Sequence, residues 1–162
     1  MIQQTLFDDE DITFEQTTLE DARAEMIRTK MTGKATKCPV CDQTVKVYAR
    51  TILGTQIRQR ALLGSVGEPL HPKEINRRTN SLGCDYTKLR YWDLVEQDDE
   101  GLWYSTDKGL SFLRGEINVE KYKFTYNAQV VEYGESQEMV SARDSCGKKF
   151  SYDEIMSQAG FI

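Results

Sequence analysis

The sequence predicts an α+β fold in which several short helices pack with small antiparallel hairpins. Apolar residues recur at helical spacing in some stretches, and apolar and polar residues alternate in others, as in half-buried strands. Glycine, asparagine and acidic residues mark turns between these stretches. The chain has 162 residues, of which 39% are hydrophobic. This is enough for one ordinary core without disulfide bonds.

The chain begins with an acidic cluster that contains isolated apolar side chains, and we expect 1–16 to form a loosely held arm. The pattern changes at Thr18. Thr18 and Asp21 can start a helix in the manner of a capping box, and apolar residues follow at helical spacing. We therefore predict a helix over about 18–31, which Gly33 connects to the sequence KCPVCDQ.

A second helix is predicted over about 45–63, interrupted by Gly54 and closed by Gly64 or Gly67. One of its sides is apolar and the opposite side is basic. The apolar side consists of Val45, Tyr48, Ala49, Ile52, Leu53 and Ile57, and the basic side of Lys46, Arg50, Arg58 and Arg60. We group 17–67 as helices that carry the Cys-x-x-Cys turn.

A short helix is predicted over 72–79, because Pro72 suits a first helical turn and the stretch from Asn80 to Gly83 suits the turn beyond it. The next helix is expected to present two stripes. One stripe contains Tyr86, Leu89, Arg90 and Asp93, and the other contains Cys84, Thr87, Lys88 and Tyr91.

A hairpin and a further helix are predicted to follow. Leu94 and Val95 lead into a strand, EQDDEG makes a turn, LWYS returns as a second strand, and Thr106 caps a helix. Residues 68–116 therefore form one segment with the order helix, helix, hairpin, helix.

In the last segment, 117–162, alternating aromatic residues predict a hairpin. Its first strand carries Tyr122, Phe124 and Tyr126 on one face, and its second strand lies around 129–133. Ser151 followed by Glu154 predicts a capped terminal helix that ends at Gly160.

The net charge of −5 conceals a strong segregation along the chain. Residues 1–27 carry eight acidic and one basic side chain, 28–90 carry four and thirteen, and 91–162 carry fourteen and seven, so the blocks have net charges of −7, +9 and −7. Because salt screens charges over about 8 Å, a ligand senses the nearest block more than the total. The middle block can therefore bind an anion. The alternative is that the blocks neutralise one another within the fold.

Several function classes have no support in the sequence. It contains no apolar run near the ~20 residues of a membrane span and no signal-peptide core after Met1, so we expect a cytoplasmic protein. No phosphate-binding glycine loop, nucleophile elbow or metal-hydrolase helix is present, and the only histidine, His71, has no visible catalytic partner. We therefore expect a protein that is not an enzyme.

The stretch HPKEINRRTN, CDYTKLRYWDLVE and QDDEGLWYSTDKGLSFL resembles the supporting helix, reading helix and wing of a winged helix-turn-helix domain of the MarR and PadR type. The whole chain also resembles small phage and bacterial proteins, without an assigned activity, that join a CPxC segment, a KLRYW helix and a wing. The resemblance implies an α+β fold with a winged helix-turn-helix core, an N-terminal helix, a Cys-x-x-Cys knuckle and a C-terminal hairpin plus helix.

In winged helix-turn-helix proteins the reading helix enters the major groove, while the supporting helix and wing contact phosphates. The resemblance therefore implies base contacts from Thr87, Lys88 and Tyr91, and phosphate contacts from Lys73, Arg77 and Arg78. The sequence departs from the family at the wing tip, where Asp98, Asp99 and Glu100 would repel phosphates. We expect this wing to stay out of the minor groove. The aromatic residues can instead be core residues, and the arginines a solvated face.

Cys38 and Cys41 are spaced so that both thiolates can bind one tetrahedral zinc ion. The remaining ligands are open, with Cys84, Cys146, His71 or the same knuckle of a second copy as candidates. Two thiols without a metal and a redox-active pair are the alternatives.

The predicted function is a DNA-binding regulator of phage or bacterial origin that binds duplex DNA as a homodimer. The rival is a non-catalytic phage protein that binds and inhibits a host enzyme or defence complex.

Overall fold

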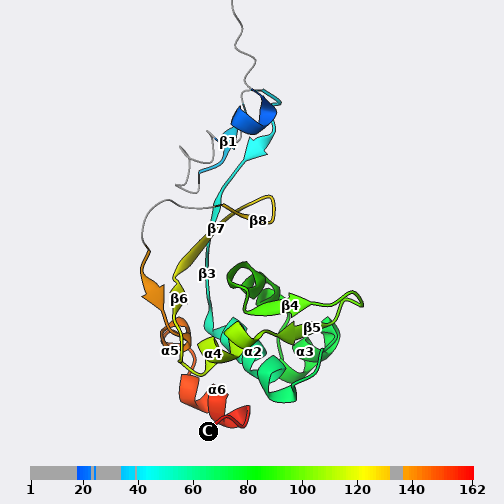
Figure 1. Cartoon of the computed structure of the whole chain (residues 1–162), viewed down its shortest axis with the longest axis vertical. Helices are drawn as coiled ribbons and strands as arrows, with labels where there is room; N and C mark the ends of the chain where they lie inside the picture. The colour runs from blue at the N-terminus through cyan, green and yellow to red at the C-terminus, as the bar shows by residue number, and fades with distance from the viewer. Residues whose placement is uncertain (1–17, 23, 25–33, 39, 132–136) are drawn as a thin grey trace, which may run out of the picture.

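The chain forms a mixed α+β structure, as the sequence predicts (Figure 1). This computed structural model describes residues 18–22, 24, 34–38, 40–131 and 137–162. The predicted acidic arm, 1–16, lies outside the described residues. No described helix is long and apolar enough to cross a membrane.

One compact part of the molecule surrounds the helix α2, which spans Gly54–Val66. Ile57, Ala61 and Leu63 of α2 are buried in the main core. The elements packed against α2 include the helix α3 (Pro72–Thr79), the 3₁₀ helix η1 (Asp85–Trp92), the strand β5 (Trp103–Ser105) and the helix α4 (Asp107–Leu113). The strand β4 (Val95–Gln97) pairs with β5 and contacts η1.

The helix predicted over 72–79 is confirmed, and its boundaries follow from local chemistry. Pro72 occupies the first turn, where a missing N–H costs nothing. Asn80 ends the helix in the left-handed conformation with φ 49°. The predicted β4–β5 hairpin and the cap of α4 are also confirmed, since the Thr106 hydroxyl accepts a hydrogen bond from the Gly109 N–H at 2.9 Å.

The helix after Cys84 is a 3₁₀ helix, with about three residues per turn in place of 3.6. Tyr86, Leu89 and Trp92 are spaced three apart, so they align on one side and are buried at 0%, 0% and 1% exposure. The prediction that Arg90 shares the stripe of Tyr86 and Leu89 is therefore wrong. Arg90 is exposed, because a 3₁₀ helix turns it away from the core.

The prediction of one helix over about 45–63 is wrong in its first half. Thr44–Val45 forms β2, Tyr48–Thr51 forms β3, and the helix begins only at Gly54. Val45 and Val47 are both buried at 1% exposure, while Lys46 between them is half-buried. This alternation, together with β-branched residues, favours extended chain over helix.

The strands β3 and β7 extend away from the part of the molecule around α2 (Figure 1). β7, Tyr122–Tyr126, lies between β3 and β8, Gln129–Val131, in an antiparallel sheet. The hairpin predicted around Tyr126 is thus confirmed for its described residues, and it gains β3 as a third strand. Beyond β3, the strand β1, Thr36–Lys37, pairs with β2.

The C-terminal residues return to the main core. The terminal helix is confirmed as α6, Tyr152–Gln158, whose cap Ser151 accepts a hydrogen bond from the Glu154 N–H at 3.3 Å. Ile155 and Met156 pack in the same core as α2. Three short elements were not predicted, namely β6 (Val119–Glu120), β9 (Met139–Val140), which pairs with β6, and α5 (Ala142–Ser145).

The predicted helix at 18–31 is described only near its start. Residues 19–22 and 24 are helical, and the Asp21 N–H donates to the Thr18 hydroxyl at 3.1 Å, as a capping residue does. Ala22 is buried in a small second cluster with Cys38 and Val45. The remainder of this predicted helix lies outside the described residues.

Candidate nucleic-acid interface

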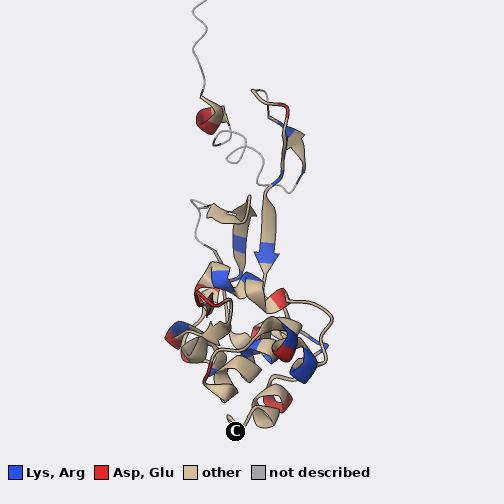
Figure 2. Cartoon of the chain, turned by 90° about the vertical axis from the view of Figure 1, so that its right-hand side faces the viewer, with Lys and Arg blue, Asp and Glu red and all other residues tan. Residues whose placement is uncertain are grey.

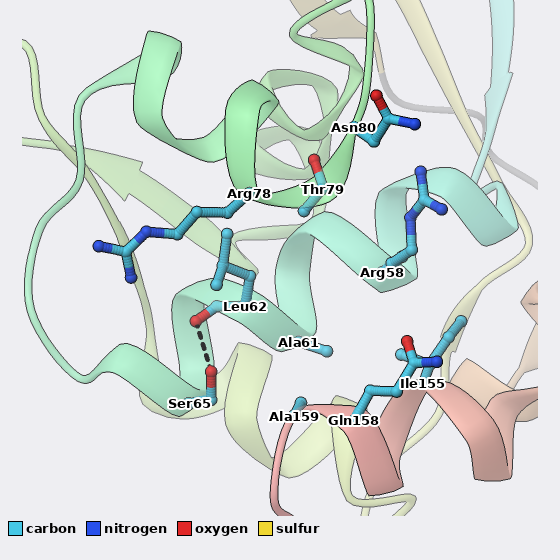
Figure 3. A pocket seen from close by; sticks show the side chains of 10 residues that line it. All are labelled: Arg58, Ala61, Leu62, Ser65, Arg78, Thr79, Asn80, Ile155, Gln158 and Ala159. Atoms are coloured by element: carbon cyan, nitrogen blue, oxygen red, sulfur yellow. Dashed lines mark hydrogen bonds between the residues drawn. The ribbon is translucent and has the colours of Figure 1, made fainter.

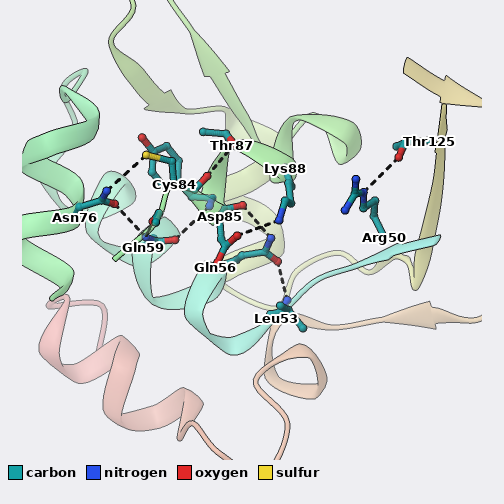
Figure 4. A network of polar contacts seen from close by, with 12 residues as sticks. Arg50, Leu53, Gln56, Gln59, Asn76, Cys84, Asp85, Thr87, Lys88 and Thr125 are labelled. Carbon is teal, nitrogen blue, oxygen red and sulfur yellow. Dashed lines mark hydrogen bonds and ion pairs between the residues drawn. The ribbon is translucent and has the colours of Figure 1, made fainter. Parts of the chain in front are cut away.

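Two buried glutamines of α2 hold the start of η1 in place (Figure 4). Gln59 donates through Nε2 to the Gly83 carbonyl at 3.0 Å and accepts at Oε1 from the Tyr86 N–H at 3.2 Å. Gln56 donates through Nε2 to the Asp85 carbonyl at 2.9 Å. The turn between α3 and η1 is thus fixed by side chains from a third helix.

These hydrogen bonds explain why polar residues occupy core positions of α2. Gln56 and Gln59 are each 1% exposed. The start of a helix leaves backbone groups without helical partners, and burying them unpaired costs about 1–3 kcal/mol each. Both glutamines therefore stabilise the turn between α3 and η1 and orient these two helices relative to each other. Neither glutamine was predicted from the sequence, although polar residues within an apolar helical stretch are a usable signal.

The three predicted phosphate-contacting residues Lys73, Arg77 and Arg78 are all exposed on α3. Two of them share one acidic partner. Arg77 donates to the Glu74 carboxylate at 2.6 Å, and Arg78 also donates to it. Hydrogen bonds from Arg77 and then Arg78 lower the pKa of Glu74 to about 2, so its carboxylate is ionised at neutral pH.

The predicted base-contacting residues of η1 have different environments. Lys88 is half-buried and its Nζ lies 3.0 Å from the Asp85 carboxylate. Thr87 is half-buried and its hydroxyl donates to the Cys84 carbonyl at 2.8 Å. Tyr91 packs partly against the main core, so it has less freedom to reach a ligand.

Two further residues of this surface were not predicted as contacts. Arg90 is exposed, with its guanidinium carbon 5.4 Å from the Tyr91 ring centroid. Leu82, in the turn between α3 and η1, is fully exposed. A 3₁₀ spacing of three residues per turn would have predicted Arg90 as exposed, which the α-helical spacing did not. No pattern in the sequence marks Leu82 as an exposed apolar residue.

The surface of α3, the turn and η1 retains a positive charge after its internal ion pairs are counted. Residues 72–92 contain five basic and two acidic side chains, a net charge of +3. The acidic partners, Glu74 and Asp85, lie on the same short helices as the basic residues they contact. Because solvent screens exposed pairs of this kind, they contribute little to stability and exchange readily for another anion.

The β4–β5 turn is acidic and internally hydrogen-bonded. The Asp98 carboxylate accepts from the N–H groups of Glu100 and Leu102 at 3.0 and 2.8 Å. Gly101 adopts φ 83°, a conformation that favours glycine. At the base of the hairpin, the Tyr104 hydroxyl donates to Glu96 at 2.7 Å, and this bond raises the pKa of Tyr104. The hairpin therefore presents negative charge at its tip.

A pocket of about 310 Å³ lies beside this surface, between α2, the end of α3 and α6 (Figure 3). Ala61, Leu62 and Ile155 supply apolar walls, and the guanidinium groups of Arg58 and Arg78 lie toward its two ends. Arg58 also donates to the Ser81 hydroxyl at 3.4 Å. The pocket thus adds a fixed cation behind the turn.

The four cysteines lie in different environments. Cys38 is buried in the small cluster, and Cys41 is exposed on the β1–β2 turn. The candidate partners lie elsewhere, since Cys146 belongs to the main core and the His71 Nδ1 accepts from the Lys73 N–H at 3.2 Å. Cys84 accepts from the Asn76 amide at 3.5 Å. Within the described residues, no three histidine, cysteine or acidic side chains are grouped as metal ligands.

Comparison of the chain with known protein families, characterised proteins and solved structures finds no match. The interpretation of this surface therefore depends on its own geometry.

Proposed function

We propose that 54–113 is a winged helix-turn-helix domain that binds duplex DNA through α3 and η1. The element order supports the proposal. After α2, Leu70 pairs with Trp103 of β5 as an isolated antiparallel bridge, and α3, η1, β4 and β5 follow. The proposal takes these elements as a helix, a short strand, the supporting helix, the reading helix and a two-stranded wing. DNA binding and transcription regulation are the functions such a domain most often serves.

The observation that carries the proposal is the outward position of the basic residues of α3 and η1. Lys73, Arg77 and Arg90 are exposed. Arg77 pairs with Glu74 of the same helix, and Arg90 shares a hollow with the exposed residues Asp93 and Glu96. A cationic surface whose ion pairs are weak and solvated can exchange them for phosphates, because counterion release favours that exchange. In this proposal Lys73, Arg77 and Arg78 contact backbone, and Thr87, Lys88 and Arg90 lie nearest the bases.

The acidic hairpin tip limits how this domain docks. Asp98, Asp99 and Glu100 would lie against phosphates if the hairpin entered a groove. We therefore infer that α3 and η1 make the contact without the hairpin tip. Contacts to phosphates then dominate affinity, and the discrimination between sequences is modest.

The rival function, a non-catalytic interaction with a host protein, is favoured by one specific observation. Leu82 is a large apolar residue that is fully exposed in the turn between α3 and η1. An exposed leucine suits a protein contact as well as a thymine methyl group. The two functions are separated by the ligand that the surface prefers.

The test is a fluorescence anisotropy titration of the protein into labelled duplex DNA at about 50 to 200 mM salt. The proposal predicts binding at low salt and a steep loss of affinity as salt rises. The Arg77→Ala/Arg78→Ala variant should bind weakly, and the matched control is the Lys148→Ala/Lys149→Ala variant, which removes the same charge from exposed positions elsewhere and should bind DNA within about twofold of the parent. Absence of binding near 50 mM salt, or salt-independent binding, contradicts the proposal.

The Cys-x-x-Cys turn supports a second, separate proposal of zinc binding by Cys38 and Cys41, completed by the same turn of a second copy in a homodimer. Both cysteines lie on one tight hairpin turn, where the Asp42 N–H donates to the Cys38 carbonyl at 2.9 Å. Elemental analysis should find one zinc per two chains, and sedimentation should find a dimer that dissociates with a chelator. A metal-free protein of unchanged mass and stability contradicts it.

A further inference from the structure

A basic and aromatic row runs along one face of β3, outside the surface described above. Tyr48 and Arg50 lie within β3, and Lys46 precedes Tyr48 by two positions. Side chains two residues apart on extended chain share a face. The Lys46 Nζ lies 4.8 Å from the centroid of the Tyr48 ring, and the Arg50 guanidinium carbon lies 4.7 Å from it. One aromatic ring thus holds two cations in a row.

The cations of this row are available to an anionic ligand. Among the described residues, neither Lys46 nor Arg50 forms an ion pair, whereas the nearby Lys121 and Lys123 pair with Glu138 and Glu120 at 2.7 and 2.9 Å. Arg50 is oriented by a hydrogen bond from its Nε to the Thr125 hydroxyl at 3.3 Å. No described acidic side chain therefore neutralises either cation, and the hydrogen bond fixes the position of Arg50.

The row also lies on an unpaired edge of the sheet. The strand order is β3–β7–β8, so β3 has a sheet neighbour on one side only among the described residues. Tyr48 is 45% exposed. Figure 2 shows basic residues on both β3 and β7, above the part of the molecule around α2. A long polyanion can therefore approach this edge without obstruction by the neighbouring strand.

A hollow of about 540 Å³ adjoins the row at its N-terminal end. Its lining contains two aromatic rings and several uncharged polar groups, and none of the described residues that line it is acidic. The side chains that matter for recognition are Gln43, Thr44, Lys46, Tyr48, Tyr126 and Asn127. Aromatic rings stack on flat heterocycles, and amide groups hydrogen-bond to their edges.

We propose that this face, made of Lys46, Tyr48, Arg50 and the adjoining hollow, binds single-stranded nucleic acid. A base enters the hollow beside Tyr48 and Tyr126, and the flanking phosphates contact Lys46 and Arg50. A base in a duplex is stacked and paired, so only an unpaired base can enter such a hollow. The combination of aromatic residues with a cationic groove is the general means of binding single strands.

An acidic peptide is the competing occupant of a cationic sheet edge. Such a peptide would pair with Lys46 and Arg50, but it would leave the aromatic and amide groups of the hollow without a role. The hollow therefore favours a ligand that combines phosphates with heteroaromatic rings. This inference is independent of duplex binding by α3 and η1, because the two surfaces share no residue.

The test uses the full chain and labelled oligothymidylate of about 15 nucleotides, titrated across a salt series. The Lys46→Ala/Arg50→Ala variant should flatten the slope of log affinity against log salt by about 1.4, since each neutralised phosphate of a single strand contributes about 0.7. The Tyr48→Ser variant should weaken binding roughly 5- to 150-fold, the range reported by base–aromatic stacking. Circular dichroism and thermal unfolding establish that each variant is folded.

Matched controls separate this proposal from its alternatives. Lys148→Ala/Lys149→Ala removes the same charge from an exposed loop and should leave single-strand binding unchanged. Arg77→Ala/Arg78→Ala should lower duplex affinity alone. The proposal is overturned if the parent does not bind oligothymidylate, if the loop variant loses as much affinity as the β3 variant, or if polyglutamate of equal charge displaces the oligonucleotide equally well. Loss of duplex binding alone would instead refute the function proposed for α3 and η1.

Discussion

Replacing Gln59 with leucine removes its two hydrogen bonds to the start of η1, and a longer one to the Asn76 amide oxygen at 3.5 Å, while keeping a side chain of similar size. Gln59 is 1% exposed and contacts the Gly83 carbonyl and the Tyr86 N–H. The Tyr86 N–H lies inside the core, and leaving it unpaired costs about 1–3 kcal/mol. Gly83 is exposed, so water can replace its partner, and the loss there is about 1 kcal/mol.

We therefore expect Gln59→Leu to lower the free energy of unfolding by about 2–4 kcal/mol. Urea denaturation followed by circular dichroism measures this loss, with the m value unchanged from that of the parent. The matched control is Gln158→Leu on the exposed face of α6, which should change stability by less than about 0.5 kcal/mol. If both variants unfold at the parent's urea concentration, the role assigned to Gln59 is refuted.

Three further predictions concern charge and ionisation. Glu74→Gln frees Arg77 and Arg78 from their shared carboxylate, so duplex affinity should rise. The slope of log affinity against log salt, measured by anisotropy titration, should steepen by about one unit. Unchanged affinity would show that these arginines do not contact the DNA. Arg60 is fully buried, its three guanidinium nitrogens have no described hydrogen-bond partner, and burial lowers its pKa to about 10. Arg60→Met should therefore be neutral or stabilise the fold by up to about 4 kcal/mol in urea denaturation. A destabilised variant would contradict this. Burial raises the pKa of Cys146 to about 11, so its thiolate is scarce at pH 8. Iodoacetamide should therefore alkylate the exposed Cys41 and Cys84 first, which peptide mass spectrometry would report. Equal rates of alkylation would contradict the burial of Cys146.

Elements whose ends are marked by capping or turn residues were predictable from the sequence. The bounds of α3 follow from Pro72 and Asn80, and the start of α4 follows from Thr106. The acidic turn around Gly101 defines the β4–β5 hairpin. Each of these signals acts within a few residues, so no tertiary information was needed to recognise it.

Elements that depend on distant partners were not predictable. The stretch at Tyr48–Thr51 fits a helical pattern, but it pairs with β7, and the hydrogen bond from Arg50 to Thr125 joins residues 75 positions apart. Tertiary pairing here overrides a periodicity that is too short to distinguish a helix from a strand. As a result, Lys46 and Arg50 were predicted on a helix, whereas they lie at the edge of a sheet.

The geometry of η1 was missed for a related reason. An eight-residue segment contains too few turns to separate a period of 3.0 from one of 3.6, and the difference moves Arg90 from the core to the surface. The candidate residues of α3 were predicted correctly as exposed. Their shared contact with Glu74 was visible in the sequence as spacings of three and four residues, which bring helical side chains together.

The most direct test of DNA binding is an amide ¹H–¹⁵N spectrum of the protein recorded as a short duplex is added. The account predicts that resonances from α3, the turn at Leu82 and η1 shift together, while those of Asp98, Asp99 and Glu100 at the hairpin tip remain in place. Shifts centred on the hairpin tip, or no shifts at low salt, would contradict the account.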